Sequence, residues 1–361
     1  MKNRTNTAKW YEKRGYWKIN VQKDGERRSF YSSTPGRTGQ REANRKADLW
    51  LDDNINPTGE RLEAVYKAFK AECKQTYSKT EYHHVDSIGR CWIIPYLGKK
   101  KITALCDGDI QKMLDKAAAL GRSRKTIQDI NGITNKFLKW CRKNKLTAYR
   151  PDDVQIPAGA RYIGKQVLQP DDLKILFSVS TTVYRGQIVE DEYIHAYRLQ
   201  VLTGLRPGEL RGLRVEDFDG ERVFVRRSIN RYGDETQGKN QNAIRSFVLS
   251  EHAKKELQAQ LSEYPSKDYI FHLPHESTYN ERWQRFCATN GLTKTTPYEL
   301  RHTFVSIAKT LPAGEIKPLV GHSQSMDTFG VYGHALEGED IVTASKIDSL
   351  FDVVLKDKTA E

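Results

Sequence analysis

The chain has 361 residues, with 59 lysines and arginines against 46 aspartates and glutamates, and a formal net charge of +13. This length predicts two or three domains, and the charge favours a polyanionic partner over a small acidic ligand. The five cysteines form no CxxC pair, and neither a leader nor a long apolar run is visible, so we expect a cytoplasmic protein with reduced thiols and no membrane span.

The amino-terminal segment, residues 1–57, carries the signals of a hairpin. Asp24-Gly25 predicts a two-residue turn, because glycine accepts the positive φ that a primed turn requires. With that turn, Ile19 pairs with Phe30 on an apolar face. The opposite face is polar, basic and aromatic, with the cross-strand pairs Lys18–Tyr31, Asn20–Ser29 and Gln22–Arg27.

Two further elements complete this segment. Lys9–Glu12 is a candidate third strand. Gln40–Asp52 has a helical pattern in which Ala43 and Ala47 are able to cover the apolar face. We therefore expect a small three-stranded sheet with one helix.

Residues 58–146 are helical in pattern and predict a domain of four helices. The second helix includes Glu81–Leu97, the third begins at Asp109, and the last covers Ser123–Lys145 with Ser123 as N-cap. Two exposed basic residues, Arg124 and Lys125, open the last helix. The adjacent histidines, His83 and His84, match no zinc spacing, so no metal site is predicted.

Residues 147–160 contain two prolines, a glycine and no periodicity, which predicts an interdomain linker. Residues 161–361 follow as a mostly helical third domain with two strands, Arg222–Arg227 and Arg245–Leu249. The expected fold class is therefore α+β, mainly α.

Two separated stretches of the third domain carry residues suited to phosphodiester chemistry, namely Thr203–Leu213 (TGLRPGELRGL) and Thr296–Ala335. In chain order they supply Arg206 beside Glu209, then Arg301, Gly321-His322 and Tyr332. Guanidinium groups match phosphate oxygens, and a phenol beside them is suited to nucleophilic attack. Taken singly, Arg206 is also explained as a buried partner of Glu209, and Tyr332 as a core tyrosine.

In these motifs and their order the chain resembles the tyrosine recombinase, or phage integrase, family of site-specific DNA strand-exchange enzymes. The resemblance covers the whole chain and is most specific in the two stretches just named. It implies that Arg206 and Arg301 clamp a DNA phosphate and that His322 donates a hydrogen bond to the same oxygens. Tyr332 would be the nucleophile, and Glu209 would orient Arg206.

Two more residues take roles from the resemblance. Lys239 matches the lysine of the family's hairpin, a proposed general acid for the leaving 5′ oxygen; a solvated loop lysine is the alternative. Tyr298 stands three residues before Arg301, where many members have histidine. Because a phenol exchanges its proton readily only near pH 10, Tyr298 is expected to position rather than shuttle a proton, with a packing aromatic as the alternative.

The resemblance also makes residues 1–57 an arm-type DNA-binding domain and residues 58–146 a core-binding domain. In the arm domain the expected contacts to a DNA major groove are those of Lys18, Asn20, Arg27 and Tyr31. In the core-binding domain Arg124 and Lys125 are expected to contact phosphates. An ordinary solvated polar face is the alternative for both sets.

The implied reaction joins two duplexes through a 3′-phosphotyrosine, without a cofactor, and integrates or excises a phage or other mobile element. The expected partners are double-stranded attachment sites and three further copies of the chain, with an excisionase or a host DNA-bending protein as candidate accessories. The tail helix within Gly338–Leu355 is expected to dock either on a neighbouring copy or in cis. The alternative functions are a type IB topoisomerase-like enzyme and a catalytically silent DNA-binding regulator.

Overall fold

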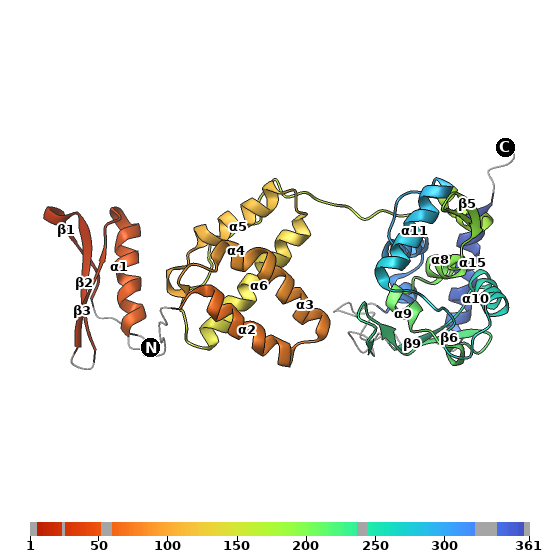
Figure 1. Ribbon diagram of the computed structural model, residues 1–361, viewed down its shortest axis with the longest axis horizontal. Coiled ribbons are helices and arrows are strands. Elements are labelled where there is room, and N and C mark those ends of the chain that lie inside the picture. Colours follow the sequence, from red (N-terminus) through yellow and green to blue (C-terminus); the bar gives the residue numbers. More distant parts are fainter. Residues whose placement is uncertain (1–5, 24–25, 52–59, 237–243, 322–337, 357–361) are drawn as a thin grey trace. The chain divides into compact units, whose positions relative to one another are not determined.

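The computed structural model describes residues 6–23, 26–51, 60–236, 244–321 and 338–356. The chain divides into two compact units, residues 1–163 and 164–361. Both units hold helices together with small antiparallel sheets (Figure 1), which confirms the expected fold class. Within the described ranges, no helix is both long and apolar enough to cross a bilayer.

The amino-terminal sheet has three antiparallel strands in the order β1 (Lys9–Tyr11), β2 (Tyr16–Lys23) and β3 (Glu26–Ser32). Helix α1 (Gly36–Leu51) lies along one face of it (Figure 1). The register places Ile19 opposite Phe30, as predicted, and the three polar pairs are likewise confirmed: Lys18 opposite Tyr31, Asn20 opposite Ser29 and Gln22 opposite Arg27.

A small core explains why this helix covers this sheet. The inward residues of β2, Ile19 and Val21, are buried against Ala43 and Ala47 of α1, both of which are fully buried. Alanine side chains let the helix approach the sheet closely, and alternation along the strand leaves the other face exposed.

The remainder of the first unit is built from five α-helical segments. They are α2 (Leu62–Thr76), α3 (Lys79–Ile88), α4 (Ile94–Leu97), α5 (Asp107–Ala119) and α6 (Arg124–Lys143). Helices α3 and α4 occupy the stretch predicted as one helix, but a π-helical turn over Gly89–Ile93 joins them. Gly89 fits there because a Cβ would lie 2.2 Å from the Tyr66 ring.

Capping explains the boundaries of the next helices. Helix α5 begins two residues before the predicted Asp109, since the Asp109 carboxylate accepts a hydrogen bond from the Cys106 N–H at 3.2 Å and closes the first turn. Ser123 is the N-cap of α6, as predicted, and its hydroxyl accepts from the Thr126 N–H at 3.1 Å.

The segment predicted as a linker, residues 147–160, packs against the same helices. Tyr149 and Ala160 are buried in their core, and the Tyr149 hydroxyl donates to Asp107 at 2.5 Å. The Arg124 N–H also donates to the Arg161 carbonyl at 2.8 Å. The boundary between the compact units falls after these contacts, at residues 163 and 164.

The second unit is organised around α8 (Ile194–Thr203), which is buried on nearly all sides. Its other α-helices among the described residues are α7 (Pro170–Ser178), α9 (Pro207–Arg211), α10 (Glu251–Glu263), α11 (Glu276–Asn290), α12 (Pro297–Ile307), α13 (Ala313–Val320) and α15 (Glu339–Leu355). Helices α10 and α12 pack directly on α8, so α8 holds the following residues against the centre of the unit.

In the described part of this unit, the helices are accompanied by three short antiparallel strand pairs. The two predicted strands are confirmed as β6 (Arg222–Val225) and β9 (Arg245–Val248), which pair with each other. A hairpin of β4 (Thr181–Tyr184) and β5 (Gln187–Glu190) was not predicted, and neither was the pairing of β7 (Ser228–Ile229) with β8 (Glu235–Thr236). These four strands are short and mostly exposed, so they lack a clear alternating pattern.

The tail helix α15 folds back in cis. Ile347 and Phe351 are buried in the core of the second unit. The Asp348 carboxylate caps α10, accepting from the backbone N–H groups of Glu251 and His252 at 2.7 and 3.1 Å. Of the two docking modes expected for this helix, the structure shows the intramolecular one.

Candidate active site

Arg206 is delivered by the bend between α8 and α9. Gly204, whose φ is +67°, is the C-cap that follows α8, and Arg206 is the N-cap of α9. Glu209 lies in the first turn of α9, and its carboxylate accepts from the Arg206 backbone N–H at 3.0 Å and from Nη1 at 2.6 Å. Glu209, three residues along the chain, therefore holds the Arg206 side chain against the first turn of α9.

Arg301 comes from the second turn of α12. That helix is fixed at its start by Glu299, which accepts from the N–H and hydroxyl of Thr296 at 2.8 and 3.0 Å. The Arg301 side chain is 2% exposed. It donates from Nη1 to the carbonyl of Gly204 at 2.8 Å and from Nη2 to that of Val320 at 2.6 Å.

The carboxyl end of α13 gathers three arginines. Successive backbone carbonyls accept one hydrogen bond each, with the pairs Leu319–Arg245 Nε at 2.7 Å, Val320–Arg301 Nη2 at 2.6 Å and Gly321–Arg206 Nη2 at 3.2 Å. The last carbonyls of a helix lack intrahelical partners and carry the negative end of its dipole. This helix end therefore holds three like charges together.

Glu209 provides the only carboxylate among the described contacts of this cluster, so three guanidinium groups leave an excess of two positive charges. Burial and the neighbouring Arg206 charge lower the pKa of Arg301 to about 10, so it stays protonated at neutral pH. Burial opposes ionisation of Glu209, but the hydrogen bonds and charges of Arg245 and Arg206 lower its pKa below the usual value. Its donors and its charge make the cluster a candidate anion site.

The structure thus brings together three of the predicted site residues, Arg206, Glu209 and Arg301. Lys239, His322 and Tyr332 lie outside the described residues. No group of three or more potential metal ligands occurs in the parts of the chain that the structure describes.

Two neighbouring residues complete the description. Tyr298 is 45% exposed, so it is not a core aromatic, and its ring centroid lies 5.6 Å from that of His302. Sequence reasoning missed Arg245, which bonds both oxygens of Glu209 at 3.1 and 2.9 Å. Only its place at the start of a strand marked it, and that position carries no chemical signal.

Comparisons with known proteins agree with this geometry. Residues 166–339 match the family model described as the phage integrase family, and this range contains every part of the arginine cluster. This part of the chain is a phage integrase domain. The chain is a tyrosine site-specific recombinase.

Similar proteins extend the likeness beyond the matched range. An integrase of Streptomyces ambofaciens is 24% identical, with 95% of each chain covered. The Tn1549 transposon integrase, solved in complex with circular intermediate DNA, has a TM-score of 0.63 and 18% identity over 78% of this chain and 98% of that one. The lambda integrase tetramer bound to a Holliday junction has a TM-score of 0.54 and 16% identity over 93% and 99%.

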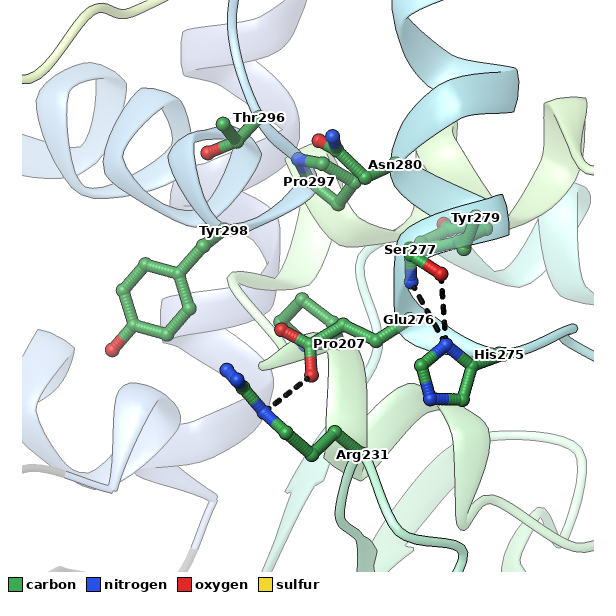
Figure 2. Close-up of a pocket in the computed structure, with 10 residues that line it drawn as sticks. All are labelled: Pro207, Arg231, His275, Glu276, Ser277, Tyr279, Asn280, Thr296, Pro297 and Tyr298. Atoms are coloured by element: carbon green, nitrogen blue, oxygen red, sulfur yellow. Dashed lines mark hydrogen bonds and ion pairs between the residues drawn. The ribbon is translucent and has the colours of Figure 1, made fainter. Parts of the chain in front are cut away.

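The second unit of this recombinase contains a cavity of about 420 Å³ (Figure 2). Its lining residues are Pro207, Arg231, His275, Glu276, Ser277, Tyr279, Asn280, Thr296, Pro297 and Tyr298. Arg231 and Glu276 form an ion pair at 3.4 Å on its wall. Pro207 and Tyr298 adjoin the cluster in sequence, but neither Arg301 nor Glu209 lines the cavity. The arginine cluster is therefore not part of the cavity lining.

The polar face of the arm sheet groups the residues expected to meet DNA. Lys18 Nζ lies 5.5 Å from the Tyr31 ring centroid and 5.9 Å from that of Tyr11. The Asn20 side-chain oxygen accepts from the Ser29 hydroxyl at 2.6 Å, and Arg27 is exposed. A hydrogen bond with Ser29 and the nearby Lys18 charge lower the pKa of Tyr31.

On helix α6 of the first unit, Arg124 and Lys125 are both exposed. Lys125 forms an ion pair with Asp129, one turn along the helix, at 2.7 Å. An exposed pair of this kind is weak, about 0.3–0.5 kcal/mol, so a phosphate can compete for the lysine.

Replacing Gly204 with alanine is expected to destabilise the second unit and to misplace Arg206. A Cβ would lie 2.5 Å from Phe304 Cδ1, at a φ that side chains rarely adopt. The strained backbone and the overpacking together predict a loss of about 2–4 kcal/mol, measured by urea unfolding. Gly186→Ala is the control, since its φ is also positive but a Cβ meets nothing within 4 Å. A loss for Gly204→Ala no larger than for Gly186→Ala would contradict the packing argument.

Proposed function

We propose that this recombinase cleaves and rejoins double-stranded DNA at attachment sites through a 3′-phosphotyrosine formed by Tyr332, and so integrates or excises a mobile element. The observation that carries the proposal is the arginine cluster at the end of α13, with its two excess positive charges. It supplies preorganised donors for a phosphodiester, which is how enzymes stabilise the charge of a phosphoryl-transfer transition state.

In the first step the Tyr332 oxygen attacks the phosphorus, the bond to the 5′ oxygen breaks, and that oxygen takes a proton from Lys239. Arg206 and Arg301 neutralise the nonbridging oxygens, and His322 donates to them. Tyr298, exposed beside the cluster, positions the substrate. The phenol proton leaves to a base before or during attack, and the general acid makes the 5′ oxygen a better leaving group.

In the second step the 5′ hydroxyl of a partner strand attacks the phosphotyrosine, which restores the phosphodiester and frees Tyr332. The ester retains the energy of the broken bond, so ATP is not required, and we expect activity in the presence of EDTA. Two such exchanges between duplexes need four copies of the site, and lambda integrase is known as a tetramer bound to a Holliday junction. We propose the same assembly here, in the cytoplasm, with α15 able to exchange from its cis position.

The arm sheet is proposed to bind a second DNA segment. Lys18 and Arg27 would contact phosphates, Asn20 a base edge, and Tyr31 would pack against the backbone, while Arg124 and Lys125 would hold the core site. An excisionase or a host DNA-bending protein would act by bringing the two segments together.

Replacing Lys18 and Arg27 together with alanine is expected to weaken binding to arm-type DNA by about 10- to 100-fold, because two phosphate contacts are lost. The slope of log affinity against log salt concentration should fall by about one for each lost contact. Cleavage of an isolated core site should be unchanged. Fluorescence anisotropy over a range of salt concentrations measures both quantities. The double variant Arg37→Ala/Arg41→Ala, on exposed parts of α1, is the control, and an equal loss there would indicate general electrostatics instead of a defined face.

Strand exchange between two duplexes tests the function as a whole. The full chain is incubated, without Mg²⁺, with labelled duplexes from the DNA that flanks its gene, where an attachment sequence is expected. Joining of strands from two different duplexes supports the proposal. A covalent adduct with relaxation of supercoils but no joining would favour a topoisomerase-like enzyme, and specific binding without any adduct would favour a silent regulator.

A further inference from the structure

Arg245 opens strand β9 and joins two parts of the arginine cluster. Its Nη1 and Nη2 donate to the two oxygens of Glu209 at 3.1 and 2.9 Å, and its Nε donates to the carbonyl of Leu319 at 2.7 Å. The side chain is 7% exposed, against 30% for Arg206. Its donors are therefore turned into the protein, whereas Arg206 reaches the surface.

The shared carboxylate makes the two arginines interdependent. Oxygen Oε1 of Glu209 accepts from Nη1 of both Arg206 and Arg245. Without Arg245, a buried carboxylate would be balanced by Arg206 alone, which would draw the exposed guanidinium inward and away from a phosphate. The cluster would also lose one of its two excess positive charges.

We propose that Arg245 is a positioning residue for strand cleavage, which acts through Glu209 to hold the guanidinium of Arg206 in the orientation that meets the scissile phosphate. The contact with Leu319 fixes the end of α13 at the same time, two residues before Gly321. This assignment rests on the proposed function, because it concerns the same phosphate. A lysine cannot replace this residue, since one ammonium cannot span two carboxylate oxygens and a carbonyl.

The test compares Arg245→Lys and Arg245→Gln with the wild-type full chain in single-turnover cleavage of nicked duplexes from the DNA that flanks the gene. Adduct formation is expected to slow by about 10- to 100-fold in both variants, as for a catalytic group displaced by about 1 Å, while DNA affinity changes by less than about 3-fold. Should Arg245→Gln fail to fold, Arg245→Lys carries the test by itself.

Arg198→Lys is the matched control. The side chain of Arg198 is 11% exposed, donates to the carbonyls of Leu176 and Val179, and lies 3.5 Å from the Glu256 carboxylate. Among the described residues it has no contact with Glu209. Its replacement is expected to leave the cleavage rate unchanged. An equal slowing in this control would reduce the role of Arg245 to general stability and overturn the proposal.

Two further measurements distinguish an effect on the position of Arg206 from an effect on Lys239 and from an effect that does not act through Glu209. Arg245 follows Lys239 by six residues, so a substitution at Arg245 could also disturb this general acid. A substrate with sulfur at the bridging 5′ position tests this, because a thiolate leaves without a general acid. The defect should persist on this substrate, and rescue by sulfur would assign the effect to the Lys239 loop. In a Glu209→Gln background, Arg245→Lys should cause no further loss, whereas additive losses would contradict action through Glu209.

The inference and the function fail in different ways. A wild-type chain that forms no adduct on any DNA refutes the proposed function. A wild-type chain that forms the adduct, together with Arg245→Lys at full rate, refutes only the role of Arg245.

Discussion

Replacing Tyr332 with phenylalanine is expected to abolish the covalent protein–DNA adduct and to lower strand exchange by more than about 10⁴-fold, the scale of losing a catalytic nucleophile. Only one oxygen is removed, so DNA affinity should change by less than about 2-fold. The measurement is a denaturing gel of the full chain with nicked duplexes, from which the short 5′-hydroxyl strand diffuses away and leaves the adduct trapped.

Tyr264→Phe is the control, because it makes the same chemical change at another exposed tyrosine, 38% exposed and distant in sequence from the cluster. Its adduct should form at the wild-type rate. If Tyr332→Phe still forms the adduct in full and Tyr298→Phe does not, Tyr298 is the nucleophile, and the substrate is held differently by the arginines.

Arg206→Ala is expected to retain DNA binding and to lose about 10³-fold in cleavage rate, as when a main transition-state donor is removed. The variant should fold, since Glu209 keeps its two hydrogen bonds from Arg245. On a substrate whose scissile phosphate carries a methyl group in place of one charged oxygen, less charge has to be neutralised. The cleavage rates of Arg206→Ala and the wild type should therefore differ less on this substrate.

Arg282→Ala is the matched control for this variant. Arg282 has the same side-chain exposure, 30%, and also faces a carboxylate, that of Glu192 at 3.4 Å. It should cleave at the wild-type rate. If Arg206→Ala loses binding and cleavage in equal proportion, this arginine serves general docking and the anion-site interpretation is wrong.

The sequence determined the features that depend on local chemistry. The turn predicted at Asp24-Gly25 lies outside the described residues, but a two-residue turn there leaves one pairing that places Ile19 opposite Phe30, and β2 and β3 have this register. Ser123 marked the start of α6 in the same way. The spacing of Arg206, Arg301, His322 and Tyr332 was specific enough to indicate the phage integrase family, whose model matches residues 166–339.

Only the tertiary structure decided how the cluster is held together. The three carbonyls that end α13 are not visible as a binding group in a sequence, because every residue has a carbonyl and only the fold leaves these three accessible to arginines. Arg245 belongs to no motif, and its role arises from the approach of β9 to α9 and α13. The cis docking of α15 likewise depends on a core assembled from distant segments, and local periodicity does not encode such long-range packing.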